Sequence, residues 1–125
     1  MKIISFAWTT PAFLAGRKTR TRRDWSDDYA KRFHVGDVCQ AWDHVPRVKG
    51  AKRVGTLRIT GLKKEDLREM PDEDFEKEGF AYLEETGFKI WDMDAREAFG
   101  EWKLNADIQD EPTMMWVVDF EKTEP

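Results

Sequence analysis

Residues 10–23 read TPAFLAGRKTRTRR, and this stretch decides how the N-terminal half of the chain folds. Thr10 before Pro11 is a hydroxyl N-cap followed by proline at the first helical position, and Gly16 is a typical residue to end such a short helix. The next seven residues hold five cations and two threonines, and the alternate β-branched side chains predict a strand over 18–23. This much positive charge beside hydroxyl groups indicates a site for an anionic or strongly polar ligand.

Other strands are expected on both sides of this stretch. Ile4, Phe6 and Trp8 fall on one face of an alternating run, which predicts a first strand. Three more runs of strand-forming residues cover 38–42, 54–60 and 114–120. A basic loop, 46–53, joins the first two of these runs.

Three helical segments are expected between the later strands. Ser26 caps the first, and Pro71 begins an acidic second region in which Gly79 and Gly87 are the expected stops. The last begins with an Asp94–Glu97 capping box, and its aromatic face is expected in the core; the residues at helical spacing are Trp91, Ala95, Ala98 and Trp102. The order of elements predicts an α+β domain whose sheet curls into a small barrel of about five to six strands, with helices packed around it.

The chain of 125 residues is expected to form a single domain, 1–125, with a frayed tail at 122–125. Its apolar N-terminal run is too short for a signal peptide or a membrane span, so a soluble cytoplasmic protein is expected. No metal or cofactor is expected. The spacing of His34, Cys39 and His44 matches no compact zinc motif, and Cys39 is expected to pack as a small apolar side chain.

Charge is divided unevenly along the chain. Residues 1–64 hold 15 Lys+Arg and 5 Asp+Glu, whereas residues 65–125 hold 6 and 20. One interpretation is complementary packing of an acidic helical layer on a basic sheet. The other is a basic face left open to phosphates, since such asymmetry is one signal of nucleic-acid contact. From charge alone, complementary packing is favoured.

The elements and their joints resemble the ASCH domain, a member of the PUA-like superfamily of small β-barrels. The most specific segment is Gly-x-Lys-x-x-Thr-x-Arg at 16–23, and the resemblance covers nearly the whole chain. It also includes, in the family's order, Val35-Gly36-Asp37, Gly55-Thr56-Leu57-Arg58-Ile59, Glu78-Gly79 and Trp116-Val117-Val118-Asp119-Phe120.

The resemblance implies a cleft between sheet and helices that takes RNA or a nucleotide-like ligand. One group of the family hydrolyses N4-acetylcytidine and related acylated cytosines, and ribonuclease activity is also claimed in the family. By position, Lys18 and Thr21 match a Lys and a Thr of the hydrolase group, and Glu78 is the best match for its Glu, although Glu73 and Glu76 lie close by.

Such a trio is chemically sensible. Thr21 needs a base to become a nucleophile, and Lys18 can serve if burial or neighbouring cations lower its pKa. Glu78 would protonate a leaving amine or orient a water. Positions 18 and 21 have opposite strand parity, so Lys18 must lie in the turn before the strand, or the strand must bulge. The alternative is a plain Lys18–Glu78 salt bridge beside an ordinary threonine.

Binding of RNA or of a nucleotide- or nucleoside-like ligand is the predicted function. The alternatives are an amidohydrolase acting on N4-acylated cytosines, a ribonuclease and a protein-interaction module. Trp25 and Trp42 are the candidates for stacking on a base. The cationic ligand-binding candidates are Arg17, Arg20, Arg22, Arg23 and Arg53.

Overall fold

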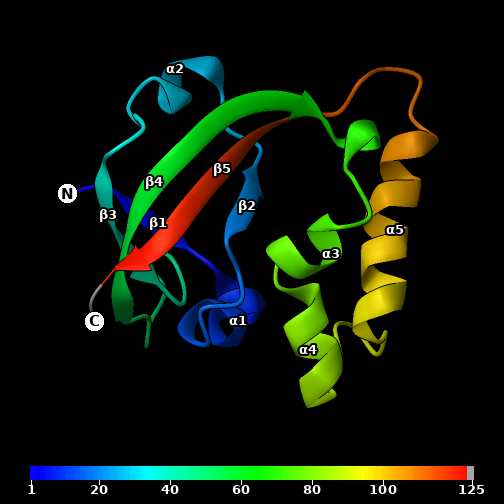
Figure 1. Ribbon diagram of the computed structural model, residues 1–125, viewed down its shortest axis with the longest axis horizontal. Coiled ribbons are helices and arrows are strands. Elements are labelled where there is room, and N and C mark those ends of the chain that lie inside the picture. Colours follow the sequence, from blue (N-terminus) through cyan, green and yellow to red (C-terminus); the bar gives the residue numbers. More distant parts are fainter. Residues whose placement is uncertain (124–125) are drawn as a thin grey trace.

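The computed structural model describes residues 1–123 (Figure 1). Its strands are β1 (Ile3–Ser5), β2 (Arg20–Arg23), β3 (Val38–Trp42), β4 (Arg53–Asp66) and β5 (Met114–Thr123). Its helices are α1 (Thr10–Leu14), α2 (Asp27–Ala30), α3 (Asp74–Lys77), α4 (Phe80–Thr86) and α5 (Ala95–Asp107), with short 3-10 helices η1 (Ala7–Thr9) and η2 (Leu67–Glu69).

The five strands form one mixed sheet in the order β1-β3-β4-β5-β2. Only β1 and β3 are parallel, and the other neighbours are antiparallel. The α+β class is thereby confirmed. The sheet is not closed into the expected barrel, because β1 and β2 remain as separate edges and do not pair. A hydrogen bond from the Arg23 side chain spans the gap: Arg23 Nη2 donates to the Ser5 carbonyl oxygen at 2.5 Å.

The predicted strands differ from the observed ones mainly at their ends. The first stops at Ser5 because Ala7 takes a left-handed φ of 49° and the chain turns into η1. The second starts at Arg20 because the turn at Gly16, with φ 73°, continues into Lys18, whose backbone N–H donates to the Ala12 carbonyl. The strand predicted at 54–60 continues to Asp66 through a bulge near Gly61.

The helices divide between the two ends of the molecule. In Figure 1, α3, α4 and α5 lie together beyond the β2 edge of the sheet, whereas α1 and α2 lie at the sheet's own ends. The Asp94–Glu97 capping box is present at the start of α5, as predicted. Lys122 and Thr123, predicted to fray, instead pair with β4, and residues 124 and 125 of the predicted tail lie outside the described residues.

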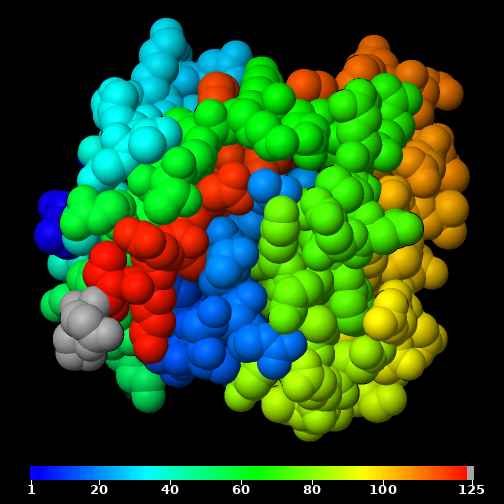
Figure 2. Space-filling model, in the orientation of Figure 1, coloured from blue at the N-terminus to red at the C-terminus, as the bar shows by residue number. Residues whose placement is uncertain are grey.

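The core consists of two apolar clusters, one in the sheet part and one in the helical part of the molecule. One packs Phe6, Phe13, Phe33 and Phe120 with aliphatic side chains of the sheet. The other packs Phe75, Phe80 and Phe99 with aliphatic side chains of the helices, over residues 67–106. Figure 2 shows the blue N-terminal segment and β2 in direct contact with the green α3–α4 segment. The join between the two clusters is where the functional site must be sought, because ligand sites favour such boundaries.

Gly79 is a critical joint between α3 and α4. Its φ is 98°, and an added Cβ would lie 2.9 Å from the Ala12 Cβ and 3.4 Å from the Lys18 Cβ. We expect Gly79→Ala to lower the free energy of unfolding by about 1–3 kcal/mol, as backbone strain and a close contact add together. Chemical denaturation measures this value.

Gly87→Ala is the matched control for that change. Gly87 also has a positive φ, of 74°, but an added Cβ would meet nothing within 4 Å. Gly87→Ala should therefore lower the free energy of unfolding through backbone strain alone, and by less than Gly79→Ala does. Equal losses in the two variants would show that the contact with α1 and Lys18 has no energetic weight.

Candidate functional site

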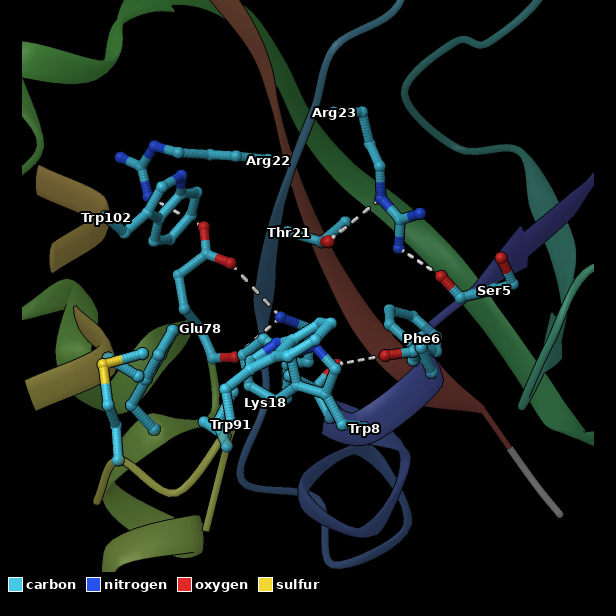
Figure 3. A pocket seen from close by; sticks show the side chains of 16 residues that line it. Ser5, Phe6, Trp8, Lys18, Thr21, Arg22, Arg23, Glu78, Trp91 and Trp102 are labelled. Carbon is cyan, nitrogen blue, oxygen red and sulfur yellow. Dashed lines mark hydrogen bonds and ion pairs between the residues drawn. The ribbon is translucent and has the colours of Figure 1, made fainter. Parts of the chain in front are cut away.

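A cavity of about 460 Å³ lies where the two apolar clusters meet (Figure 3). It is surrounded by residues of both edge strands, the turn after β1, α4, α5 and the segment before α5. Its polar residues come mainly from β2 and the turn before it, and its apolar residues from the helical part. The lining residues are Ser5, Phe6, Ala7, Trp8, Thr9, Lys18, Thr21, Arg22, Arg23, Glu78, Phe80, Ile90, Trp91, Met93, Ala98 and Trp102.

Lys18 enters this cavity from the turn that precedes β2, so strand parity does not separate it from Thr21. The residue is 4% exposed. Its Nζ donates to the Glu78 carbonyl oxygen at 2.7 Å and to Glu78 Oε1 at 3.2 Å. Burial lowers the pKa of the Lys18 amine; the Glu78 carboxylate opposes this effect, and the cations Arg23 and Arg22 lower the pKa further. A lysine held in this way is poised to lose its proton more readily than a surface lysine.

Glu78 is the acidic residue that the cavity contains. It is buried at the C-terminal end of α3, where its Oε2 accepts from Arg22 Nη1 at 2.8 Å while Oε1 faces Lys18. Figure 3 shows its carboxylate between these two cations. The alternatives lie elsewhere: Glu76 is exposed and pairs with Arg17, and Glu73 is exposed and pairs with Lys77.

Asp74 is a buried carboxylate that the sequence did not single out. It is 0% exposed, and its Oδ2 lies 2.6 Å from Arg22 Nη1. Arg20 Nη1 donates to both of its oxygens at 3.1 Å. On their other sides, Arg22 Nη2 donates to Glu65 and Arg20 Nε donates to Asp119. The pairs form a network that fastens β2 to α3 beneath the cavity.

Thr21 and Arg23 form the opposite polar wall. Thr21 is buried, and its Oγ1 accepts from Arg23 Nε at 3.1 Å. The Arg23 guanidinium also lies 5.6 Å from the centre of the Phe6 ring. Among the described residues no carboxylate lies within 4.0 Å of Arg23, unlike the other arginines of this strand. Burial lowers the pKa of Arg23 to about 10, so its guanidinium stays cationic at neutral pH. No carboxylate of the described residues neutralises this charge through an ion pair.

Most of the basic stretch is neutralised inside the protein. Arg17 pairs with Glu76 and Glu85 of the helical part, and Lys18, Arg20 and Arg22 have the partners already described. The uneven charge of the sequence is thus largely complementary packing of the basic strand on acidic helices. Arg53, in contrast, is exposed at the start of β4 and does not line the cavity.

The two tryptophans expected to stack on a base do not line the cavity. Trp25 stacks on Phe33 with ring centres 4.2 Å apart, and Trp42 Nε1 donates to Gln40. The cavity has three other tryptophans, which are Trp8, Trp91 and Trp102. Trp91 was expected on the face of the last helix that packs in the core, but it precedes α5 and is 88% exposed. Sequence spacing misplaced it because the turn at 91–92 interrupts the helical register.

Other candidates lie apart from the site. His34 and His44 are exposed, whereas Cys39 is buried in the sheet cluster, and no group of three metal-binding side chains occurs within residues 1–123. None of the helices in that described part has the length and apolar character that a membrane crossing requires.

The fold is similar to two solved structures. One is protein EF3133 from Enterococcus faecalis, assigned to the DUF984 family, with a TM-score of 0.59, 16% identity, and coverage of 98% of this chain and 79% of that chain. The other is an ASCH domain from Lactobacillus crispatus, with a TM-score of 0.52, 15% identity, and coverage of 97% and 78%. No family model and no curated protein matches the sequence. The structural likeness nevertheless agrees with the motif order, and the chain has an ASCH-like fold.

Proposed function

We propose that the protein binds a nucleoside-like ligand in this cavity, either as a free nucleoside or nucleotide or as one unstacked nucleotide of an RNA. The observation that carries the proposal is the composition of the cavity: indole and phenyl rings on one side, and an unneutralised arginine with a buried Lys–Glu pair on the other. A planar ring that carries polar groups on its edge matches both sides.

The size of the cavity favours one nucleotide over a length of RNA backbone. A volume of about 460 Å³ lies within the range typical of small-molecule sites, roughly 300–1,000 Å³. Backbone binding needs several free cations along a surface. Arg17, Arg20 and Arg22 are each paired with a carboxylate, which leaves Arg23 as the cavity's cation for a ligand.

We expect Arg23→Met to weaken binding of N4-acetylcytidine or cytidine by about 10- to 100-fold, the value of a hydrogen bond from a charged donor. Isothermal titration calorimetry gives the affinities, and thermal unfolding checks that the variant is folded. A short single-stranded RNA, titrated at several salt concentrations, distinguishes a free nucleoside from an RNA as the source of the ligand, because phosphate contacts make affinity fall steeply with salt.

Arg53→Ala is the matched control, because Arg53 is an exposed arginine remote from the cavity. It should leave nucleoside affinity unchanged. If Arg53→Ala weakens RNA binding while Arg23→Met does not, the ligand lies on the basic loop and the cavity proposal fails.

Hydrolysis of an N4-acylated cytosine is the second candidate, favoured by the buried Lys18–Glu78 pair in the same cavity as Thr21. In this reaction Thr21 Oγ1 attacks the acyl carbonyl carbon and gives its proton to neutral Lys18. The carbon–nitrogen bond then breaks, and the cytosine amine leaves with the proton that Lys18 took from Thr21, passed on directly or through the Glu78 carboxylate. Water hydrolyses the acyl-threonine and releases the carboxylic acid.

Two contacts of the present structure bear on that reaction. Arg23 already donates to the Thr21 hydroxyl, which places a cation beside the group that must lose its proton. Lys18 donates to Glu78, and no hydrogen bond joins it to Thr21 within residues 1–123. The base role therefore requires the amine to exchange the Glu78 carbonyl for the Thr21 hydroxyl when substrate binds. Ribonuclease action has less support, because Arg20 and Arg22 are already neutralised.

A further inference from the structure

Trp91 occupies a turn that suits its side chain poorly. Ile90 and Met93 exchange two backbone hydrogen bonds, of 2.8 and 2.9 Å, and so enclose a two-residue turn. Its central residues, Trp91 and Asp92, have φ values of 54° and 66°. Turns that need positive φ at both positions favour Asn-Gly, and a bulky residue there is strained. Turn formation therefore gives no reason for a tryptophan at this position.

Packing gives no reason either. Trp91 is 88% exposed, although it lines the cavity, and so its indole contributes little apolar burial to the fold. Trp8, 38% exposed, is another indole of the cavity; it belongs to the short 3-10 helix η1 and lies next to Ala7, which has a positive φ. The Phe80 ring packs edge-on against Trp8, with the ring centres 5.4 Å apart and the planes at 77°. Strained residues concentrate where a ligand is held.

Both indoles line the same cavity as Lys18, Thr21 and Arg23. In the view of Figure 3, Trp91 and Trp8 overlap Lys18, and Thr21 and Arg23 are drawn above them. A flat ligand ring that stacks on one of these indoles would direct one edge of the ligand toward the polar wall formed by Thr21 and Arg23. There Arg23 offers donors to a carbonyl or anionic oxygen, because no carboxylate of the described residues neutralises it.

We propose that Trp91, together with Trp8, is the specificity-determining stacking surface for a planar heteroaromatic ring whose oxygen-bearing edge contacts Arg23. The inference rests on the proposed function, since it names the part of a nucleoside-like ligand that the protein reads. It assigns selectivity to the ring and its edge oxygen. The sugar and phosphate are bound less selectively, so a pyrimidine nucleoside is preferred over a sugar phosphate.

The test uses Trp91→Asn, because asparagine tolerates positive φ and removes the ring without strain. We expect its affinity for cytidine and N4-acetylcytidine to fall by about 5- to 150-fold, the loss typical of one stacking aromatic, with no fall in the midpoint of thermal unfolding. Trp91→Phe should recover part of that affinity. Leu104→Gln, which also removes an exposed apolar side chain, lies outside the cavity and should bind like the parent protein.

Ribose 5-phosphate lacks a heteroaromatic ring. It therefore distinguishes binding in the cavity from recognition of the ring. If the parent protein binds nucleosides, and Arg23→Met lowers their affinity but Trp91→Asn does not, the cavity is the site and the stacking role is overturned. If ribose 5-phosphate binds as tightly as cytidine, ring recognition is likewise overturned. If the parent protein binds none of the nucleosides, the proposed function itself fails for this class.

Discussion

Replacing Asp74 with alanine is expected to lower the free energy of unfolding by about 3–5 kcal/mol. The carboxylate is 0% exposed and contacts both Arg20 and Arg22. Its removal takes a buried carboxylate from both arginines, and although Arg22 keeps Glu65 and Glu78, the N–H groups that faced Asp74 are left without a partner where water does not reach. Urea denaturation of the parent protein and the variant measures the difference.

Asp119→Ala is the control for that prediction. Asp119 is the other partner of Arg20, but its side chain is 34% exposed, so water can replace it. We expect a loss of about 1 kcal/mol or less, the range of exposed pairs. Asp74→Asn keeps the shape of the side chain and removes its charge. It should lower the free energy of unfolding by about as much as Asp74→Ala does. If Asp74→Ala and Asp119→Ala have equal effects, the buried network does not hold β2 to α3 as described.

Lys18→Met is expected to slow hydrolysis of N4-acetylcytidine by about 10² to 10⁴-fold, the contribution of a general base. Methionine has similar length and no proton to transfer, and it leaves the Arg22–Glu78 pair in place. Formation of cytidine, followed by chromatography, gives the rates. Lys77→Met, which removes a surface lysine of α3, should leave the rate unchanged.

The pH profile gives an independent check of the Lys18 role. Burial lowers the folded-state pKa of Lys18 below the ordinary 10.5, and the neutral amine is the active form. The hydrolysis rate should therefore rise with pH through that lowered pKa and level off above it. Lys18→Met should lack this limb. A parent profile that falls over the same range would mean that charged Lys18 acts as an electrostatic group instead, and the base role would be wrong.

The regular parts of the fold follow from sequence patterns that are local. The strand at 38–42 and the capping box of α5 lie where alternation and capping chemistry put them. Lys18, Thr21 and Glu78 line one cavity, as the family resemblance implied, because a glycine turn precedes β2 and another follows Glu78. Whether these residues act on a substrate stays a prediction.

The parts that the sequence did not reveal depend on contacts between distant segments. Asp74 looks like an ordinary acidic residue of a helix N-terminus, and only the position of β2 makes it the buried partner of two arginines. Trp91 fits a helical apolar pattern by spacing, but the turn at 91–92 removes it from that face. The gap between β1 and β2 has no sequence signal, since both strands carry ordinary strand residues.

That gap has a consequence for the two edges of the sheet. Unpaired sheet edges usually template the addition of a strand from another molecule. Here both edge strands, through Ser5, Thr21 and Arg23, line one cavity, and the Arg23 side chain occupies the Ser5 carbonyl. A closed barrel would have hidden the same edges by pairing them and left no room for a ligand. The open seam therefore leaves the cavity between the two edges, and the Arg23 side chain covers one carbonyl group to which a strand from another molecule would otherwise bind.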